Sequence, residues 1–401
     1  MPDILSQGGG RESGPWPRRV AAAAVLALVA ALIVHYLPRS PQGTARPARA
    51  AATVTPPPAV SGAVSGDAGV AAEPGGITGQ VLSWPGGLRL PATGQRPVWF
   101  WPATGQVLPI GGLPPQRSGY QFTRVAGGWA VQAVCGSCAG SPRAVYFLAD
   151  RGRSAIRAGL AGAVAPGVPG TLWLTSYPPA ADPRTAAGLA REVSTAGRPL
   201  GPQVRLPAGY LIEQGTSRGL LLAPAAPQAG TMTGKLWDPA APQASRTFDT
   251  VIAASATQIA WAPPCAARCR IEVLNLATGR QASAGLPAAS SVASAAFSPD
   301  GSYLVIQVNF SDNAAAGAQA AQLERVSPAS GRLTAVPQTW VSDDALVGFG
   351  WPASSDSLVA EFSFTTKVQL ASWRPGTSRL AIVAFRPPLS AASLVIGQHA
   401  P

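Results

Sequence analysis

Short apolar runs alternate with turn residues along most of the chain, and residues 296–306 show this pattern in its clearest form. An apolar run ends at Phe297, the residues Ser298-Pro299-Asp300-Gly301 follow, and a second apolar run begins soon after them. Proline presets φ for a turn, aspartate bonds its own backbone, and glycine adopts positive φ. The stretch therefore predicts a β-hairpin. Because one hairpin cannot bury its apolar face alone, we expect further copies in the chain.

A second turn signal, a short segment that usually ends in glycine, occurs seven times. Successive copies lie about 38 to 52 residues apart, which is the length of a four-stranded repeat. The spacing predicts about seven repeats, although six or eight also fit. Each turn follows an apolar run that predicts a strand, and one of these runs, 189–193, suits a helix equally well. The runs are 98–101, 144–148, 189–193, 235–237, 271–274, 323–326 and 368–373; the turns are 102–105, 150–152, 194–197, 238–241, 276–279, 328–331 and 375–378, with glycines Gly105, Gly152, Gly197, Gly279 and Gly331.

Aromatic residues precede proline-containing turns at three corresponding places. Trp261, Phe297 and Trp351 each stand one or two residues before a proline, and a strand is predicted after each turn. We expect all three to pack between repeats as core residues; stacking on a ligand is the alternative.

The Phe297–Gly301 turn resembles the hairpin turn of a blade in TolB-like and WD40-like β-propellers, where phenylalanine or tryptophan before Ser-Pro-Asp-Gly is common. The resemblance extends over residues 79–398 and implies an all-β propeller of about seven four-stranded blades. The Gly-His and Trp-Asp dipeptides of WD40 repeats are missing except for Trp237-Asp238, which argues against the WD40 family proper. Ring closure would pair an N-terminal strand, for which 80–84 is a candidate, with 380–385 or 394–396.

An uncharged apolar run, residues 20–37, follows the pair Arg18-Arg19. Its length nearly spans a bilayer core of about 30 Å, and the arginine pair favours a cytoplasmic N-terminus. We therefore predict a short cytoplasmic segment (1–19) and a single transmembrane helix (20–37). The alternative is a cleaved export signal, but no small-residue cleavage site follows the run and the twin-arginine pattern fits poorly.

Residues 38–76 are rich in proline, alanine and glycine and contain no aromatic residue. Such a segment cannot bury enough surface to fold, and its prolines keep it semi-extended, with a reach on the order of 100 Å at most. We predict a disordered linker that holds an extracytoplasmic propeller, residues 77–398, away from the membrane.

The chain carries a net charge of +12, and the propeller region 77–401 contains 24 Arg and Lys against 14 Asp and Glu. A basic balance favours an anionic partner, either a protein or a cell-envelope polymer. Because no run of five or more basic residues occurs, we expect diffuse surface charge and no nucleic-acid binding. The abundance of alanine, glycine, proline and arginine is typical of GC-rich bacterial genomes such as those of actinobacteria.

The four cysteines form two close pairs, Cys135 with Cys138 and Cys265 with Cys269. Two such pairs suggest zinc, but they fall in the second and fifth repeats, on nearly opposite sides of a seven-bladed ring. We therefore predict one local disulfide in each pair, as suits a domain outside the cytoplasm. Redox activity is less favoured because strands flank the first pair; free thiols and metal are further alternatives. Each disulfide is expected to hold the turn that Pro299, Asp300 and Gly301 shape in the sixth repeat.

The only histidines are His35 and His399, and neither belongs to the predicted strands. This excludes Ser-His-Asp and Cys-His catalysis and histidine metal sites in the propeller. Asp343-Asp344 is the only adjacent acidic pair there, and a solvated loop is favoured over a calcium site. A glycosidase-type carboxylate pair stays open, because its members need not be adjacent in sequence. No catalytic residue, metal or cofactor is predicted, and Asp300 is expected to shape a turn only.

These observations favour a membrane-anchored, extracytoplasmic propeller that acts as a non-enzymatic binding or scaffold domain for a protein or cell-envelope ligand. The alternatives are a hydrolase or lyase with carboxylate chemistry in the propeller channel, and a sensor ectodomain that works through a partner. Fold alone does not decide among them.

Overall fold

A computed structural model describes residues 84–85, 87–135, 141–178, 181–226, 233–264, 269–310, 320–342, 345–352, 356–364, 367–385 and 394–396. The chain divides into two units, Met1–Gly66 and Asp67–Pro401, and every described residue belongs to the second. The predicted cytoplasmic segment, transmembrane helix and linker lie outside the described residues. No helix in the described part of the chain is long and apolar enough to cross a membrane.

The described residues form twenty-seven strands in six hydrogen-bonded sheets, and all strand pairs are antiparallel. The first three sheets are β1 (Leu90–Ala92), β2 (Val98–Trp101) and β3 (Gln106–Pro109); β4 (Tyr120–Val125), β5 (Gly128–Ala133), β6 (Arg143–Ala149) and β7 (Ile156–Ala161); and β8 (Ala163–Pro166), β9 (Thr171–Ser176), β10 (Leu189–Ser194) and β11 (Val204–Arg205).

The fourth sheet has seven strands: β12 (Tyr210–Thr216), β13 (Gly219–Pro224), β14 (Thr233–Trp237), β15 (Arg246–Ala254), β16 (Gln258–Ala262), β17 (Arg270–Asn275) and β18 (Gln281–Gly285). The last two are β19 (Ser290–Phe297), β20 (Leu304–Phe310), β21 (Ala320–Val326), β22 (Leu333–Ala335) and β23 (Val341–Ser342); and β24 (Leu346–Gly350), β25 (Leu358–Phe364), β26 (Lys367–Trp373) and β27 (Ala381–Phe385).

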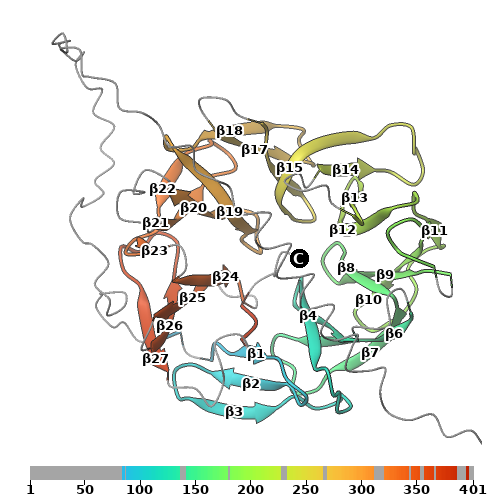
Figure 1. Ribbon diagram of the computed structural model, residues 1–401, viewed down its shortest axis with the longest axis horizontal. Coiled ribbons are helices and arrows are strands. Elements are labelled where there is room, and N and C mark those ends of the chain that lie inside the picture. Colours follow the sequence, from blue (N-terminus) through green and yellow to red (C-terminus); the bar gives the residue numbers. More distant parts are fainter. Residues whose placement is uncertain are drawn as a thin grey trace, which may run out of the picture. The chain divides into compact units, whose positions relative to one another are not determined.

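The sheets follow one another in chain order around a common centre (Figure 1). Strands β4, β8, β12, β19 and β24 lie nearest the centre, and β3, β7, β11, β18 and β22 lie toward the outside. Antiparallel sheets arranged radially in this way form a β-propeller, in which each sheet buries its faces against its neighbours. The all-β propeller architecture expected from the sequence is therefore confirmed.

Strand β15 joins two sets of strands into the seven-stranded fourth sheet. Its first half pairs with β14 and its second half pairs with β16, around an irregularity between Val251 and Ala253. The bend lets one continuous strand begin at the outer edge of one set of strands and end as the inner strand of the next set.

The two ends of the described chain meet at β1. Ala92 pairs with Leu394, and the backbone N–H of Val395 donates to the carbonyl of Pro91 at 2.9 Å. Leu394 and Ile396 also pack into an apolar cluster with residues of β1 and β25. Of the candidates for closure, the segment 394–396 pairs with the N-terminal strand. That strand is Leu90–Ala92, whereas residues 80–83 of the predicted strand lie outside the described residues, and β27 is the outer strand of its own sheet.

Apolar side chains fill the spaces between neighbouring sheets. One cluster joins Val305 and Leu323 of the β19–β23 sheet to Phe349 and Trp373 of the β24–β27 sheet. Trp261 and Trp351 are buried, and Phe297 packs against the cluster between β16–β18 and β19–β22. These three aromatic residues are core residues, as the sequence predicted.

All seven predicted turns lie between paired strands, namely β2–β3, β6–β7, β10–β11, β14–β15, β17–β18, β21–β22 and β26–β27. Residues 189–193 lie in strand β10, so that segment is not helical. Gly105, Gly197, Gly279 and Gly331 have φ between 68° and 79°. Gly152 does not adopt positive φ, so another residue is not excluded there on backbone grounds.

Candidate functional site

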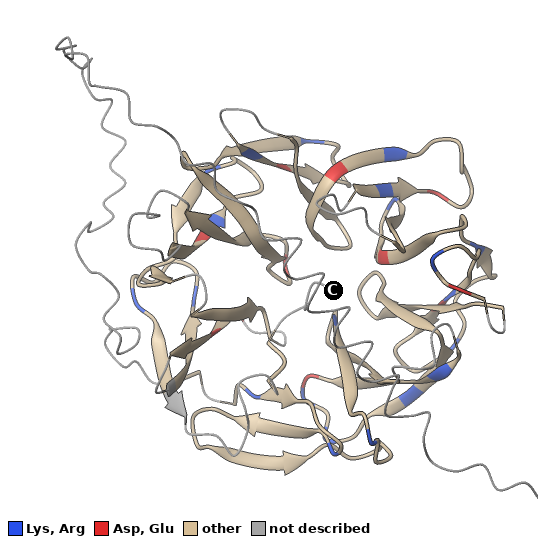
Figure 2. Cartoon of the chain, viewed as in Figure 1, with Lys and Arg blue, Asp and Glu red and all other residues tan. Residues whose placement is uncertain are grey.

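Charge is distributed unevenly around the ring. Residues 84–205, which form the three sheets from β1 to β11, contain twelve arginines and three acidic residues. We call this part the arginine-rich half (Figure 2). Eight of its arginines are exposed, whereas Asp182 is its only exposed acidic residue. The exposed arginines are Arg96, Arg117, Arg151, Arg153, Arg157, Arg184, Arg198 and Arg205.

The same half carries most of the exposed large apolar side chains. Seven of the nine such residues in the described chain lie there, and all seven are aliphatic: Val107, Leu108, Val134, Ile156, Leu160, Leu189 and Leu200. Val107 and Leu108 belong to β3, and Ile156 and Leu160 to β7. A parallel bridge between Gly111 and Ser154 joins the chain just after β3 to the chain just before β7. Apolar and positively charged groups therefore adjoin on the outer strands of two neighbouring sheets.

Not every arginine of this half is available to a ligand. The Arg89 guanidinium donates to the carbonyls of Asp150 and Gly152, at 2.9 and 2.8 Å, and lies 4.1 Å from the ring centre of Trp99. The indole N–H of Trp99 donates to the same Gly152 carbonyl. Burial lowers the pKa of Arg89 and outweighs the opposing effect of the nearby Asp150. This cluster fastens the β1–β3 sheet to the β4–β7 sheet.

Three carboxyl groups have pKa values far from their usual range. Burial raises the pKa of Glu213, Glu324 and Glu361 to about 7 in each case. Glu213 lies at an irregularity in β12, an innermost strand. Shifted pKa values occur at catalytic sites, but they also arise where a carboxyl group is merely buried.

Two of these carboxyl groups face different spaces between sheets. Glu361 shares a face of β25 with Val359, which packs toward β1, because side chains alternate along a strand. Glu324 shares a face of β21 with Val326, which packs toward β16 and β17. The β19–β23 and β24–β27 sheets lie between the two, so Glu324 and Glu361 do not form the paired carboxylates of a glycosidase.

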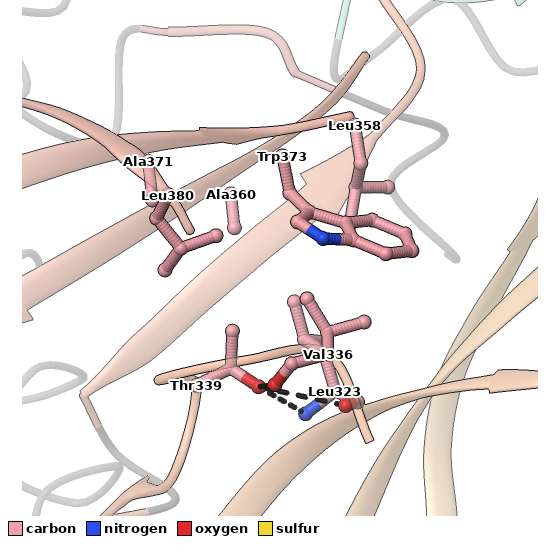
Figure 3. A pocket seen from close by; sticks show the side chains of 8 residues that line it. All are labelled: Leu323, Val336, Thr339, Leu358, Ala360, Ala371, Trp373 and Leu380. Atoms are coloured by element: carbon pink, nitrogen blue, oxygen red, sulfur yellow. Dashed lines mark hydrogen bonds between the residues drawn. The ribbon is translucent and has the colours of Figure 1, made fainter. Parts of the chain in front are cut away.

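The space between the β19–β23 and β24–β27 sheets is apolar and closed. Leu323, Val336 and Thr339 line one side, and residues including Leu358 and Trp373 line the other (Figure 3). It has no room for a water-sized sphere. It is part of the core and not a ligand site.

The Ser-Pro-Asp-Gly turn joins β19 to β20 and has an internal network of hydrogen bonds. The Ser298 hydroxyl donates to Asp300 Oδ1 at 2.6 Å and accepts from the backbone N–H of Tyr303 at 2.9 Å. Gly301 has φ of 71°. Burial would raise the pKa of Asp300, but hydrogen bonds from Ser298 and Ser302 outweigh it and lower the pKa. Phe297, Pro299 and these residues form the hairpin, and Asp300 is committed to the turn.

The cysteines lie in a different turn from the one the sequence suggested. Cys135 follows β5 and Cys269 precedes β17, so the two loops join β5 to β6 and β16 to β17. The Ser-Pro-Asp-Gly turn instead joins the first two strands of its sheet. Trp261 likewise lies on β16, whereas Phe297 lies on β19, the first strand of its sheet. The strand that corresponds to β19 is β15, which comes just before β16. The prediction that the cysteine loops correspond to the Ser-Pro-Asp-Gly turn was therefore wrong by one strand. A strand followed by a turn has the same local sequence pattern at every hairpin, so the pattern does not tell one hairpin of a repeat from the next.

The two cysteines that the structure describes, Cys135 and Cys269, are both disulfide-bonded. Cys138 and Cys265 lie outside the described residues, so the pairing within each loop stays a prediction. Asp343 and Asp344 also lie outside them. Among the described residues no group of three or more His, Cys, Asp or Glu side chains is placed to hold a metal ion.

No family model and no curated protein matches the chain. Solved structures with a similar arrangement include a protein from Lactobacillus plantarum, with 10% identity over 75% of this chain and 100% of that chain and a TM-score of 0.41. TolB from Acinetobacter baumannii matches 61% of this chain and 62% of its own, at 13% identity and a TM-score of 0.36. The β-propeller domain of the Trilobed protease from Pyrococcus furiosus matches 73% of this chain and 91% of its own, at 8% identity and a TM-score of 0.45. The assignment of the fold rests on the strand pairing described above.

Proposed function

We propose that the chain is a seven-bladed propeller that serves as a non-enzymatic binding or scaffold domain outside the cytoplasm. In this proposal the seven-stranded sheet counts as two blades that share β15. Residues 20–37 anchor the chain in the membrane, residues 1–19 are cytoplasmic, and residues 38–76 are the spacer. The disulfide bonds of Cys135 and Cys269 support the location, because disulfides persist in oxidising compartments.

The arginine-rich half carries the proposal. Eight exposed arginines against one exposed acidic residue make the exposed charge of this half positive, and seven exposed aliphatic side chains belong to the same three sheets and their loops. Arginine binds carboxylates and phosphates in a two-pronged geometry, and apolar contacts add affinity. The partner is therefore an anionic protein or an anionic cell-envelope polymer.

The test measures binding of two anionic probes, poly-L-glutamate and inorganic polyphosphate, to the full-length chain. Replacing both Arg153 and Arg157 by glutamate is expected to weaken binding roughly tenfold and to reduce its salt dependence. The matched control replaces Arg280 and Arg332, which are exposed outside the arginine-rich half, and changes the net charge equally. Equal losses in both double variants, or no binding of either probe, would contradict the proposal.

A second candidate function, an extracytoplasmic hydrolase or lyase, is favoured by Glu213 alone. Its pKa of about 7 suits a general acid or base near neutral pH, and it lies on an innermost strand. Screening the full-length chain against glycan and peptide libraries tests this function. Turnover that the Glu213→Gln variant abolishes would support it over the binding proposal.

A further inference from the structure

Trp340 is the only exposed aromatic residue among the side chains that the structure describes, at 43% exposure. Its ring lies 4.8 Å from the ring of Phe310, centre to centre, with an angle of 39° between their planes. Phe310 in turn packs against the apolar cluster between the β16–β18 strands and β19–β22. A large, exposed aromatic surface therefore rests on the core and is not part of a loose chain end.

Both chain neighbours of Trp340 are fixed. Thr339 is only 1% exposed; its hydroxyl accepts from the backbone N–H of Leu323 at 3.2 Å and donates to the carbonyl of Val336 at 2.8 Å (Figure 3). On the other side, Val341 pairs with Ala321 in the β21–β23 ladder. Ordering an exposed side chain costs entropy when a ligand binds. Here the backbone that carries the indole is already in place.

Two residues with a strained backbone conformation are close neighbours of Phe310 and Trp340. Ala289 and Gln338 are the only residues other than glycine with positive φ in the described chain, at 51° and 60°. Ala289 precedes Ser290, which pairs with Phe310, and Gln338 stands two residues before Trp340. Such conformations cost about 1–3 kcal/mol each and are concentrated at ligand-binding sites. Two separate segments thus carry strain beside one aromatic pair.

We propose that Phe310 and Trp340 form a carbohydrate-binding platform for a linear, β-linked glycan. β-Linked glucose-type rings present flat faces of axial C–H groups, which pack well on an indole. Gln338, two residues before Trp340, is exposed and has a neutral amide that suits sugar hydroxyls. Ser290 is the strand partner of Phe310; its hydroxyl donates to the Pro287 carbonyl at 2.8 Å and keeps its capacity to accept. The site belongs to the β19–β23 sheet, outside the arginine-rich half, so it is a second site that goes beyond the proposed function.

Other ligands of aromatic residues fit this surface less well. Proline-rich peptides bind in grooves lined by several aromatic residues, whereas Trp340 is the one exposed aromatic of the described chain. Single-stranded nucleic acids need a positively charged track beside the stacking residue, and Ser290 and Gln338 carry no charge.

The experiment titrates the full-length chain with cellohexaose and with chitohexaose by isothermal calorimetry. We expect at least one of them to bind the wild type, the Trp340→Ala variant to bind it roughly tenfold more weakly, and Trp340→Phe to retain most of the affinity. Leu200→Ala, which removes an exposed apolar side chain in the arginine-rich half, is expected to leave binding unchanged. Thermal melting confirms that each variant is folded.

Three results would overturn the proposal. The first is that neither hexasaccharide binds the wild-type chain. The second is that one binds but Trp340→Ala, melting as the wild type does, binds it equally well. The third is that decaproline binds through Trp340 while the hexasaccharides do not, which would assign the platform to an extended peptide. None of these results bears on the anionic probes of the arginine-rich half.

Discussion

Arg124 on the inner strand β4 forms a two-pronged ion pair with Asp150, which stands at the turn before the outer strand β7. Both side chains are largely buried, with 15% and 6% exposure. The same guanidinium donates to the Gly128 carbonyl at 2.7 Å and lies 5.0 Å from the ring centre of Trp129. Because the backbone carbonyl of Asp150 also accepts from Arg89, this residue connects two neighbouring sheets.

Replacing Asp150 by alanine is expected to lower the free energy of unfolding by about 3–5 kcal/mol, because it leaves the largely buried Arg124 charge without its partner. Urea unfolding followed by circular dichroism measures the loss. The control is Asp356→Ala, which breaks an exposed pair with Arg374 and is expected to cost about 0–1 kcal/mol. Similar losses in the two variants would show that the ion pair at Asp150 has no special role.

The sequence predicted the hairpins well because their signals are local. Pro299, Asp300 and Gly301 determine a turn by their own backbone preferences, and the second kind of turn recurs about once in each four-stranded repeat. The strand assignments for 98–101 and 271–274 follow directly from such turns. Position within a blade was less predictable: the loop after Trp261 was placed one strand too early, since each hairpin looks alike in sequence.

The candidate sites depend on contacts between distant segments, so sequence reasoning missed them. Trp340 has no distinguishing pattern in the sequence, because its exposure and its contact with Phe310 are properties of the folded sheet. The uneven distribution of charge, in contrast, can be counted from the sequence: residues 84–205 contain twelve arginines and three acidic residues, once the boundaries of the repeats are known. The burial of Glu361 has no sequence signal, since the residue stands in an ordinary strand.

Stability is expected to fall as pH rises from about 4.5 to about 7, in part because of Glu361. Burial raises the pKa of this carboxyl group from an ordinary 4.5 to about 7, so between these values the folded chain holds a proton that the unfolded chain releases. Its Oε1 atom has no hydrogen-bond partner among the described residues. Glutamine keeps the shape and cannot ionise, so Glu361→Gln should flatten part of this dependence.

Urea midpoints measured from pH 4 to pH 8 check this prediction, with the largest gain for the variant expected above pH 7. The control is Glu272→Gln, because Glu272 is also buried but accepts from Arg270 at 2.8 Å and from Gln281 at 3.1 Å. That variant is expected to lose stability. An unchanged slope in Glu361→Gln would mean that this carboxyl group is hydrated in solution.

Thiol counting tests the cysteine pairing. If each loop closes on itself, denatured protein isolated without reductant should show no reactive thiol, and reduction should release all four. The single variant Cys138→Ser should then expose one thiol, at Cys135, and leave the other pair intact. Because each loop is short, we expect a stability loss of about 2 kcal/mol or less. Four reactive thiols before reduction would contradict the disulfides.

Gly331 and Gly279 allow backbone strain to be separated from a close approach between strands. Both have positive φ, 68° and 71°, so alanine at either position costs about 1–2 kcal/mol through strain alone. A Cβ at Gly279 meets no atom within 4 Å, whereas one at Gly331 would lie 2.1 Å from the carbonyl oxygen of Ser283 in the preceding outer strand β18. Gly331→Ala must therefore move the turn off that strand and should destabilise the chain distinctly more than Gly279→Ala.

Urea unfolding of the two alanine variants measures the difference directly, since the strain term is common to both. Gly197→Ala offers a second comparison, because a Cβ there would lie 2.8 Å from the carbonyl oxygen of Ala158 in β7. Its loss is expected to fall between the other two, as its approach is less severe. Equal losses at all three positions would show that the turns do not rest on the neighbouring outer strands in solution, and that the sheets pack through their apolar faces alone.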